Sequence, residues 1–346
     1  MANDVPYKPS WVDHFTDWLN SLPIPTWLII VLIYLIAILF LHISLWIDGI
    51  QPVGTVDRTL LFDSLWSVVP LAFLLSLDRI AHRALDRFAV LVPGKKKEIE
   101  DLRYQMTNIP ARFVLGLTLF MALVISAAAY LDPAFIYEFR NPVSFAIFLF
   151  FLIFSYSFAP ILLYHSFRQL NLVTRAYRMV REINLFHLQP LYAFSGLTMA
   201  SSFFWILILN MTILDNFVFE PSSGIADILL SLAFNTPLLF LAFATFLLPL
   251  WGIHRRIQNK KEAELEKNGV QIEKVHQTLY SHLKKNDYKK GNELEKSLSS
   301  LYKMREQIEK VPTWPWNPGT LRKFLSAVFL PLGLWFVQRF LAQFLQ

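Results

Sequence analysis

The sequence predicts an all-α fold: a polytopic membrane helix bundle of six or seven transmembrane helices with a cytoplasmic helical hairpin. Mean hydropathy is +0.42 and only 17% of the 346 residues are charged, against about a quarter in soluble proteins. Several apolar runs reach the roughly 20 residues that cross a ~30 Å hydrocarbon core. Lys and Arg gather in alternate loops, which fixes how the runs are threaded.

The first 24 residues precede the apolar runs and predict an amphipathic helix at the membrane interface. Trp11, Phe15, Trp18 and Leu22 share one helical face. Tryptophans on one face and acids on the others are typical of a helix that lies at headgroup depth.

Residues 25–252 predict a six-span bundle. Loops after spans two, four and six are basic, whereas those after spans one, three and five hold Arg58, Arg140 and no basic residue. The positive-inside rule therefore predicts a cytoplasmic N-terminus. The expected spans cover residues 25–46, 59–77, 113–131, 143–165, 197–214 and 227–252.

Two of the basic loops carry helical apolar stripes and predict extended cytoplasmic helices at about 79–110 and 166–190. The first contains Lys95, Lys96 and Lys97, which we expect to contact anionic lipid headgroups, since a basic side chain near such a surface gains about 1 kcal/mol.

Residues 253–312 form the largest polar segment and predict an antiparallel, coiled-coil-like helical hairpin. Two sets of apolar residues follow heptad spacing on either side of a gap rich in turn residues. Such a hairpin is too short and polar to be stable alone, so it predicts docking to a cytoplasmic protein partner or to a second copy. The expected docking residues are Leu265, Ile272, Val275, Leu279, Leu294, Leu298, Leu301 and Ile308.

Residues 313–346 predict a Trp-rich turn followed by an apolar helix. Arg339 interrupts the apolar run near its end. The helix either spans as a seventh helix or lies along the inner leaflet, and the composition leaves both open.

The sixth span contains the stretch AFNTPLLF, residues 233–240. Pro237 removes a backbone hydrogen bond and frees the carbonyl one turn earlier. In one interpretation Asn235, Thr236 and that carbonyl line an ion or substrate site in a broken helix. In the other, these residues bond to Asn210 and Thr212 of span five and stabilise a kink.

Asp63 is the acidic residue that falls inside an expected span. A carboxylate within a membrane span is costly and suggests a functional role. It lies only one turn from the expected outer boundary, however, where water reaches it.

Several function classes find no support in the sequence. There is no cysteine, and the 11 glycines build no phosphate-binding loop or nucleophile elbow. The histidines lack the spacing of a zinc site. We therefore expect no enzymatic activity, no cofactor or metal, and no nucleic-acid partner, because the positive charge is explained by membrane topology.

Two functions compete at this point. One is a non-enzymatic scaffold or signal relay that acts through the cytoplasmic hairpin. The other is a small ion channel or permease whose path is lined by polar residues of spans two, five and six. Either would reside in a bilayer, and the lack of cysteine is compatible with a prokaryotic inner membrane.

Overall fold

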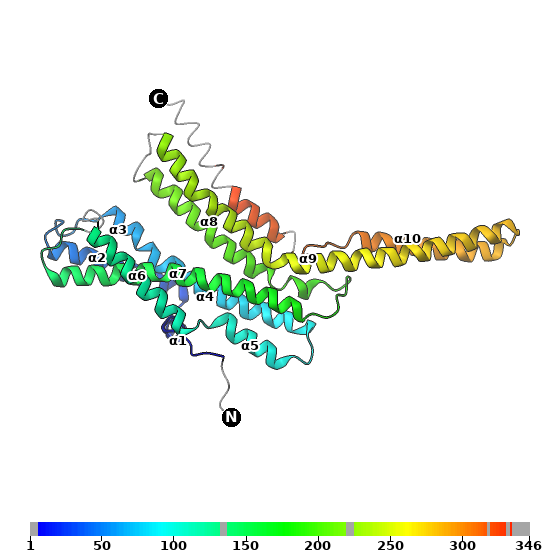
Figure 1. Ribbon diagram of the computed structural model, residues 1–346, viewed down its shortest axis with the longest axis horizontal. Coiled ribbons are helices and arrows are strands. Elements are labelled where there is room, and N and C mark those ends of the chain that lie inside the picture. The colour runs from blue at the N-terminus through cyan, green and yellow to red at the C-terminus, as the bar shows by residue number, and fades with distance from the viewer. Residues whose placement is uncertain (1–5, 132–136, 219–224, 317–318, 330–332, 334–346) are drawn as a thin grey trace.

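The computed structural model describes residues 6–131, 137–218, 225–316, 319–329 and 333. Regular structure in this part of the chain is helical, apart from an isolated β-bridge between Pro9 and Pro110. Six helices are long and apolar enough to cross a membrane. The predicted all-α class is thereby confirmed (Figure 1), and the six apolar helices support the membrane assignment.

The helices follow one another with short connections. A further helical stretch covers residues 319–329. The elements are α1 (Trp11–Ser21), α2 (Thr26–Ile47), α3 (Arg58–Asp63), α4 (Leu65–Phe88), η1 (Ala89–Leu91), α5 (Lys96–Thr107), α6 (Ala111–Leu131), α7 (Pro142–Met179), η3 (Gln189–Tyr192), α8 (Ser195–Val218), α9 (Ile225–Lys284) and α10 (Tyr288–Glu309).

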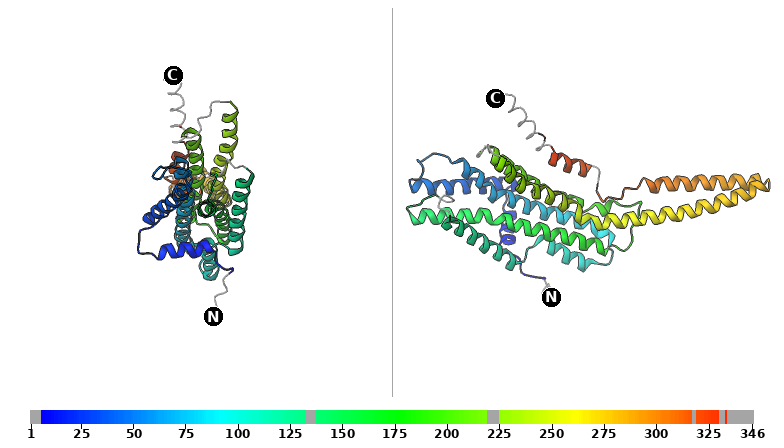
Figure 2. Two further views of the ribbon diagram at one scale, coloured as in Figure 1. Left: turned by 90° about the vertical axis from the view of Figure 1, so that its left-hand side faces the viewer. Right: turned by 45° about the horizontal axis from the view of Figure 1, so that its top comes forward.

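Helices α2, α4, α6 and α7 form the first part of the bundle, and α7 contacts the other three (Figure 2). Its interior is built from fully buried side chains such as Leu71, Leu74, Phe158 and Leu162. The 38 residues of α7 extend for about 57 Å at 1.5 Å per residue. Because this exceeds the hydrocarbon thickness, α7 extends beyond the apolar layer.

Helices α8 and α9 pair closely and diverge from the first part of the bundle (Figure 1). Helix α9 has 60 residues and contains Pro237 and Pro249, and at 1.5 Å per residue it measures about 90 Å. Its C-terminal half leaves the bundle as a rod. The helical assignment continues through Pro237, so the AFNTPLLF stretch does not break the helix.

Helix α10 folds back along α9, and we call residues 258–311 the arm. Asn286 adopts a φ of 57° in the turn, a left-handed conformation that Asn tolerates better than most residues. Asp287 caps α10 through the N–H of Lys290. Lys261 Nζ donates to the carbonyls of Glu309 and Val311, at 2.6 and 2.9 Å, which fixes the far end of α10 against the root of the arm.

Helix α1 crosses the first part of the bundle near α2 and α6. Its most buried residues are Val12, Asp13, Thr16 and Leu19, whereas Trp18 is 56% exposed. Trp11, Phe15 and Leu22 of the predicted stripe are half-buried and pack against the core of the bundle. The packed face also includes Asp13, which turns inward to accept from the backbone N–H of Ile109.

The long helices expected at 79–110 and 166–190 are shorter in the structure. Helix α4 ends at Phe88, and Gly94 takes a φ of 87° before α5 begins, a turn that Pro93 and Gly94 favour. Helix α7 ends at Met179. The expected second span is also divided, since α3 ends at Asp63 and α4 starts at Leu65.

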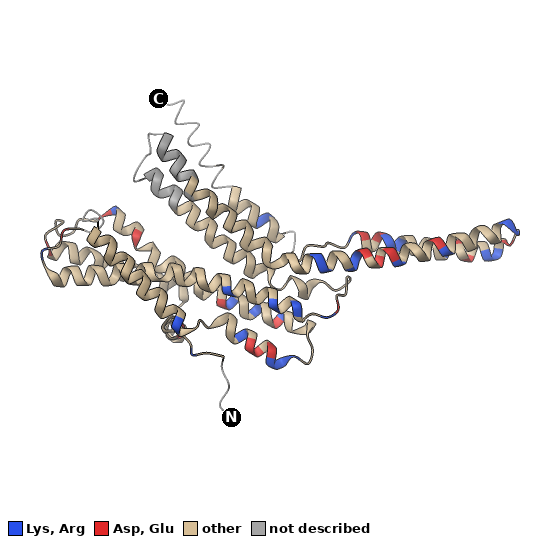
Figure 3. Cartoon of the chain, in the orientation of Figure 1, with Lys and Arg blue, Asp and Glu red and all other residues tan. Residues whose placement is uncertain are grey.

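Charged side chains are distributed unevenly. Lys and Arg concentrate where α4, α5 and α7 meet and along the arm, while the opposite end of the first part of the bundle carries few (Figure 3). We call the first of these the basic end of the bundle.

Candidate functional site

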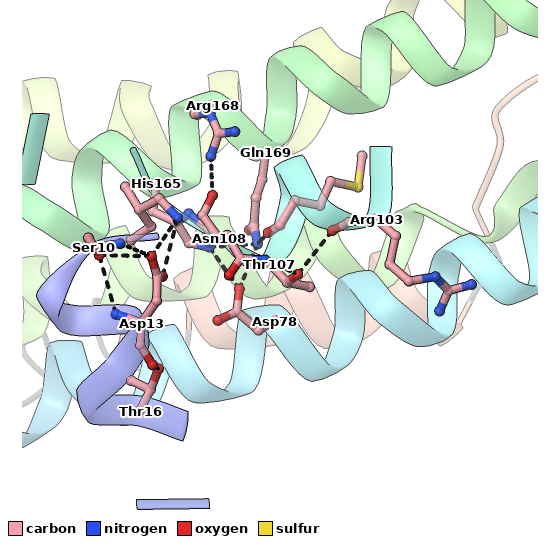
Figure 4. Close-up of polar contacts among 12 residues, drawn as sticks. Ser10, Asp13, Thr16, Asp78, Arg103, Thr107, Asn108, His165, Arg168 and Gln169 are labelled. Carbon is pink, nitrogen blue, oxygen red and sulfur yellow. Dashed lines mark hydrogen bonds and ion pairs between the residues drawn. The ribbon is translucent and has the colours of Figure 1, made fainter. Parts of the chain in front are cut away.

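A buried polar network joins α4 to α7 at the basic end of the bundle (Figure 4). His165 is fully buried, and its Nε2 lies 2.8 Å from Asp78 Oδ1. Gln169, one helical turn later, places its Nε2 3.2 Å from the same oxygen and 2.7 Å from the carbonyl of Met106. One carboxylate oxygen of α4 therefore contacts two side chains of α7, which fixes the position of one helix along the other.

Two polar groups lie close to His165 Nε2. Asp78 Oδ1 is at 2.8 Å and Gln169 Nε2 is at 2.9 Å, whereas His165 Nδ1 is buried without a hydrogen-bond partner. The polar contacts of the imidazole are therefore gathered at Nε2, on the side that faces α4.

Asp13 ties α1 to the turn between α5 and α6. Its carboxylate accepts from the N–H and the hydroxyl of Ser10, at 2.6 and 2.9 Å. The Ser10 hydroxyl in turn accepts from the backbone N–H of Asp13, and these reciprocal hydrogen bonds form a capping box. The same carboxylate accepts from the N–H of Ile109 at 3.0 Å. Asp13 therefore stabilises the first turn of α1 and also binds the backbone just before α6 begins.

Arg168 holds the opposite side of this turn. It donates to the carbonyl of Asn108 at 2.6 Å and to the Tyr7 hydroxyl, and its guanidinium lies 4.9 Å from the centre of the Tyr7 ring. Burial raises the pKa of Tyr7 to about 12, despite the nearby guanidinium. Burial likewise raises the pKa of Tyr104, whose hydroxyl donates to the Tyr7 carbonyl at 2.6 Å.

A polar cavity of about 280 Å³ lies beside the network, between α1, α4 and the turn after α5. Its walls include three carboxylates, those of Asp13, Asp17 and Asp78. Burial raises the pKa of Asp13, although hydrogen bonds from Ser10 and Ile109 oppose the shift. Arg79 also lines the cavity but bonds to Asn20 and Thr26, at 3.0 and 2.7 Å.

This arrangement places a carboxylate–imidazole pair beside a polar cavity whose walls include three carboxylates and one guanidinium. Within the part of the chain that the structure describes, no three His, Cys, Asp or Glu side chains are grouped closely enough to hold a metal ion.

The residues predicted inside the spans lie in separate places. Asp63 accepts a hydrogen bond from the Tyr156 hydroxyl of α7 at 3.0 Å. Asn210 donates to the Ile206 carbonyl of its own helix at 2.6 Å. Asn235 is half-buried in α9, while Thr236 and Pro237 are exposed on its surface. Thr212 belongs to α8, and its side chain lies outside the described residues.

These positions bear on the two interpretations of AFNTPLLF. Asp63 contacts α7, whereas Asn210 and Asn235 lie on the α8–α9 pair. The exposed Thr236 and Pro237 face away from α8.

The heptad residues of the arm lie on its inner face. Ile308 is buried and the other seven are half-buried, whereas Val270 and Tyr280, on other faces, are 61% and 69% exposed. The same face contains Asn268, which is buried and donates to the Leu301 carbonyl at 3.2 Å. Lys95 is half-buried before α5, and Lys96 and Lys97 are exposed in its first turn.

Asp78, Gln169 and Asp13 do not stand out as site residues in the sequence, and His165 stands there only at a membrane boundary. Asp78 follows the expected end of span two, and Gln169 lies beyond that of span four. One signal was present: His165 and Gln169 stand four residues apart where the apolar run of span four ends, a spacing that puts both on one face.

The fold and these contacts define an integral membrane protein whose helices are joined by a buried polar network. Comparison with family models, with curated proteins and with solved structures finds no match for this chain.

Proposed function

We propose that this chain is a non-enzymatic multi-pass membrane protein that acts as a scaffold or signal relay through its arm. The observation that carries the proposal is the continuity of α9, which passes from an apolar span into the arm within one helix of 60 residues. A continuous helix couples movement of the span to movement of the arm.

The root of the arm is also joined to the first part of the bundle. Arg256 donates to the carbonyls of Tyr177 and Val180, at 2.8 and 2.5 Å, where α7 ends. A displacement of α7 therefore reaches the arm through a bidentate contact as well as through packing. His165, the α7 member of the Asp78–His165 pair, lies on the same helix, and its partner Asp78 lines the polar cavity.

We propose a prokaryotic plasma membrane as the location, with the N-terminus and the arm in the cytoplasm. The asymmetry of Lys and Arg between the two ends of the bundle supports this orientation (Figure 3). In this orientation the arm forms a helical hairpin that projects toward cytoplasmic partners or a second copy. The six candidate spans are the membrane-crossing helices, with the C-terminal helix as a possible seventh.

The test is replacement of residues 258–311 by a short Gly/Ser linker. Lys261 contacts Val311, so the two cut ends are close and the linker need not strain the bundle. We expect insertion into membranes to persist and both self-association and chemical cross-linking to cytoplasmic proteins to disappear. If the cross-linked proteins and the oligomeric state are unchanged by the deletion, the arm is not the docking element.

The channel or permease function is the alternative. It is favoured by the acidic cavity beside α4, which would concentrate cations at the basic end. Flux of ions through liposomes that carry the purified protein tests it, with Asp78→Asn beside Asn235→Leu. A flux that Asp78→Asn abolishes and Asn235→Leu retains would place the path at the cavity.

A further inference from the structure

The segment that precedes α7 at the other end of the bundle is held in place by the side chains of Tyr137 and Phe139 and by two backbone N–H groups. Tyr137 donates its hydroxyl to Asp57 Oδ2 at 2.6 Å. The Phe139 ring packs 5.1 Å from that of Phe148. The N–H groups of Arg140 and Asn141 each donate to the Asp48 carboxylate at 2.6 Å. These contacts fix an exposed, non-helical stretch of chain.

The side chains of Glu138 and Arg140 in the same segment take no part in these contacts. Side chains alternate between two faces in extended chain, and Glu138 and Arg140 are both exposed. Neither side chain makes a hydrogen bond or an ion pair with any residue that the structure describes. An anion and a cation, two residues apart, are thus held on a rigid backbone without partners.

An apolar groove of about 440 Å³ lies between α2 and the start of α7, and its walls include Phe40, Val143, Ala146, Ile147 and Phe150. A second cavity of about 390 Å³ contains Glu138 and Arg140 in its wall. Pro142 lines both, so the charged cavity and the groove adjoin the same residue at the start of α7.

We propose that this combination is a binding site for one phospholipid with a primary-amine headgroup, of the phosphatidylethanolamine type. An acyl chain fills the groove, which faces the hydrocarbon layer because its walls belong to two spans. Arg140 donates to the phosphate, and Glu138 accepts from the ammonium group. The order of charges along the segment matches the order of phosphate and amine in the headgroup.

The choice of headgroup follows from hydrogen-bonding capacity. A primary ammonium donates three hydrogen bonds, whereas the quaternary ammonium of phosphatidylcholine donates none. The phosphate of phosphatidylglycerol can accept from Arg140, but its glycerol headgroup carries no cation to pair with Glu138. The site therefore distinguishes three common lipids by chemistry that Glu138 and Arg140 supply together.

The experiment is native mass spectrometry of the full chain in detergent, titrated separately with phosphatidylethanolamine, phosphatidylcholine and phosphatidylglycerol. We expect one tightly retained phosphatidylethanolamine. Arg140→Gln should weaken its retention by about tenfold or more, the contribution of a charge-assisted hydrogen bond. Arg58→Gln is the matched control, because Arg58 is exposed at the same end of the bundle and makes no such contact.

Two further variants separate the groove from the headgroup. Ala146→Trp fills the groove and should lower retention of all three lipids, whereas Ala127→Trp on the exposed face of α6 should not. Glu138→Gln should abolish the preference for phosphatidylethanolamine over phosphatidylglycerol. Equal retention of the three lipids by the wild type, or equal loss in Arg140→Gln and Arg58→Gln, would overturn the proposal.

Discussion

Asp78 shows how one carboxylate fixes the relation of two long helices. Its Oδ1 accepts from His165 and lies near Gln169, and these two residues occupy successive turns of one face of α7. A hydrogen bond contributes more to stability in an apolar interior than in water, because a buried polar group without a partner is costly there. Sliding α7 by one turn along α4 would replace His165 by an apolar residue, Ile161.

Replacing His165 by Leu should therefore destabilise the protein. The variant leaves Asp78 with one donor fewer, at a cost of about 1–3 kcal/mol. Thermal unfolding in detergent, followed by tryptophan fluorescence, should show a lower midpoint. Asp17→Asn is the control, because Asp17 lines the same cavity but is exposed. Asp78→Asn combined with His165→Leu should cost less than the sum of the two; strict additivity would mean that the pair is not coupled.

Asp13 and Asp57 should respond to pH in opposite ways. Burial raises the pKa of Asp13. Burial would also raise that of Asp57, but hydrogen bonds from Tyr137, Gln51 and two backbone N–H groups lower it below its usual value. The stability that Asp13 contributes falls as pH rises through its raised pKa, because the folded state keeps the proton longer. The contribution of Asp57 is present above its ordinary pKa and is lost as pH falls through the lowered one.

The measurement compares unfolding midpoints of the wild type, Asp13→Asn and Asp57→Asn across the acidic range, from below the ordinary pKa of an aspartate to above it. Relative to the wild type, Asp13→Asn should gain stability as pH rises, and Asp57→Asn should lose it. Differences that change with pH in the same direction for both variants would show that these two groups do not account for the effect.

Among the elements, α9 carries the connection between the membrane and the arm, and its neighbour α7 ends against it. The last carbonyls of a helix have no partner within it. Arg256 supplies two donors to this end of α7. A guanidinium suits this task because its donors are held in a planar fork.

Arg256→Gln should loosen the end of α7 without unfolding the bundle. We expect faster hydrogen exchange at residues 177–183, corresponding to a loss of about 1–3 kcal/mol of local stability. Arg256→Lys should rescue it only in part, since an ammonium group cannot replace the fork. The neighbouring Arg255 is exposed and lies over the Trp251 ring, so Arg255→Gln should leave exchange in this segment unchanged. Protection that survives in Arg256→Gln would show that packing alone holds the helix end.

The spans were predictable because hydropathy is a local property. The expected first and third spans, 25–46 and 113–131, differ from α2 and α6 by at most two residues at either end. The interruption at Ser64 was not predictable in this way, because its surroundings remain apolar. There the hydroxyl bonds to the Leu60 carbonyl at 2.7 Å, a contact that a hydropathy average does not reflect.

The polar network was harder to predict, for a different reason. Asp78 and His165 are 87 residues apart in sequence, and each stands at the edge of an apolar run, where polar residues are ordinary. Only the packing of α4 on α7 reveals that they face each other. Conversely, Asn235 and Thr236 stand out in the sequence, yet Thr236 is exposed in the fold.

On the scale of the whole molecule, the basic end of the bundle and the arm lie on the same side (Figure 3). Residues 253–284 of α9 measure about 48 Å at 1.5 Å per residue. A charged surface of this length is costly to place in lipid. We therefore expect the arm to project from the membrane on the side that retains the Lys and Arg residues.

The absence of cysteine from the sequence makes this orientation directly measurable, because any introduced cysteine is unique. We expect Val53→Cys, 81% exposed in the turn after α2, to react with a membrane-impermeant maleimide in right-side-out vesicles. Ser281→Cys near the tip of the arm should react only in inside-out vesicles, since the positive-inside rule places the arm in the cytoplasm. If both cysteines reacted on the same side, the number of spans between Val53 and Ser281 would be even, and the predicted topology would be wrong.

Gln346→Cys, which lies outside the described residues, then decides the number of spans. Labelling on the side of Ser281 means that the C-terminal helix lies flat, and labelling on the side of Val53 means that it crosses.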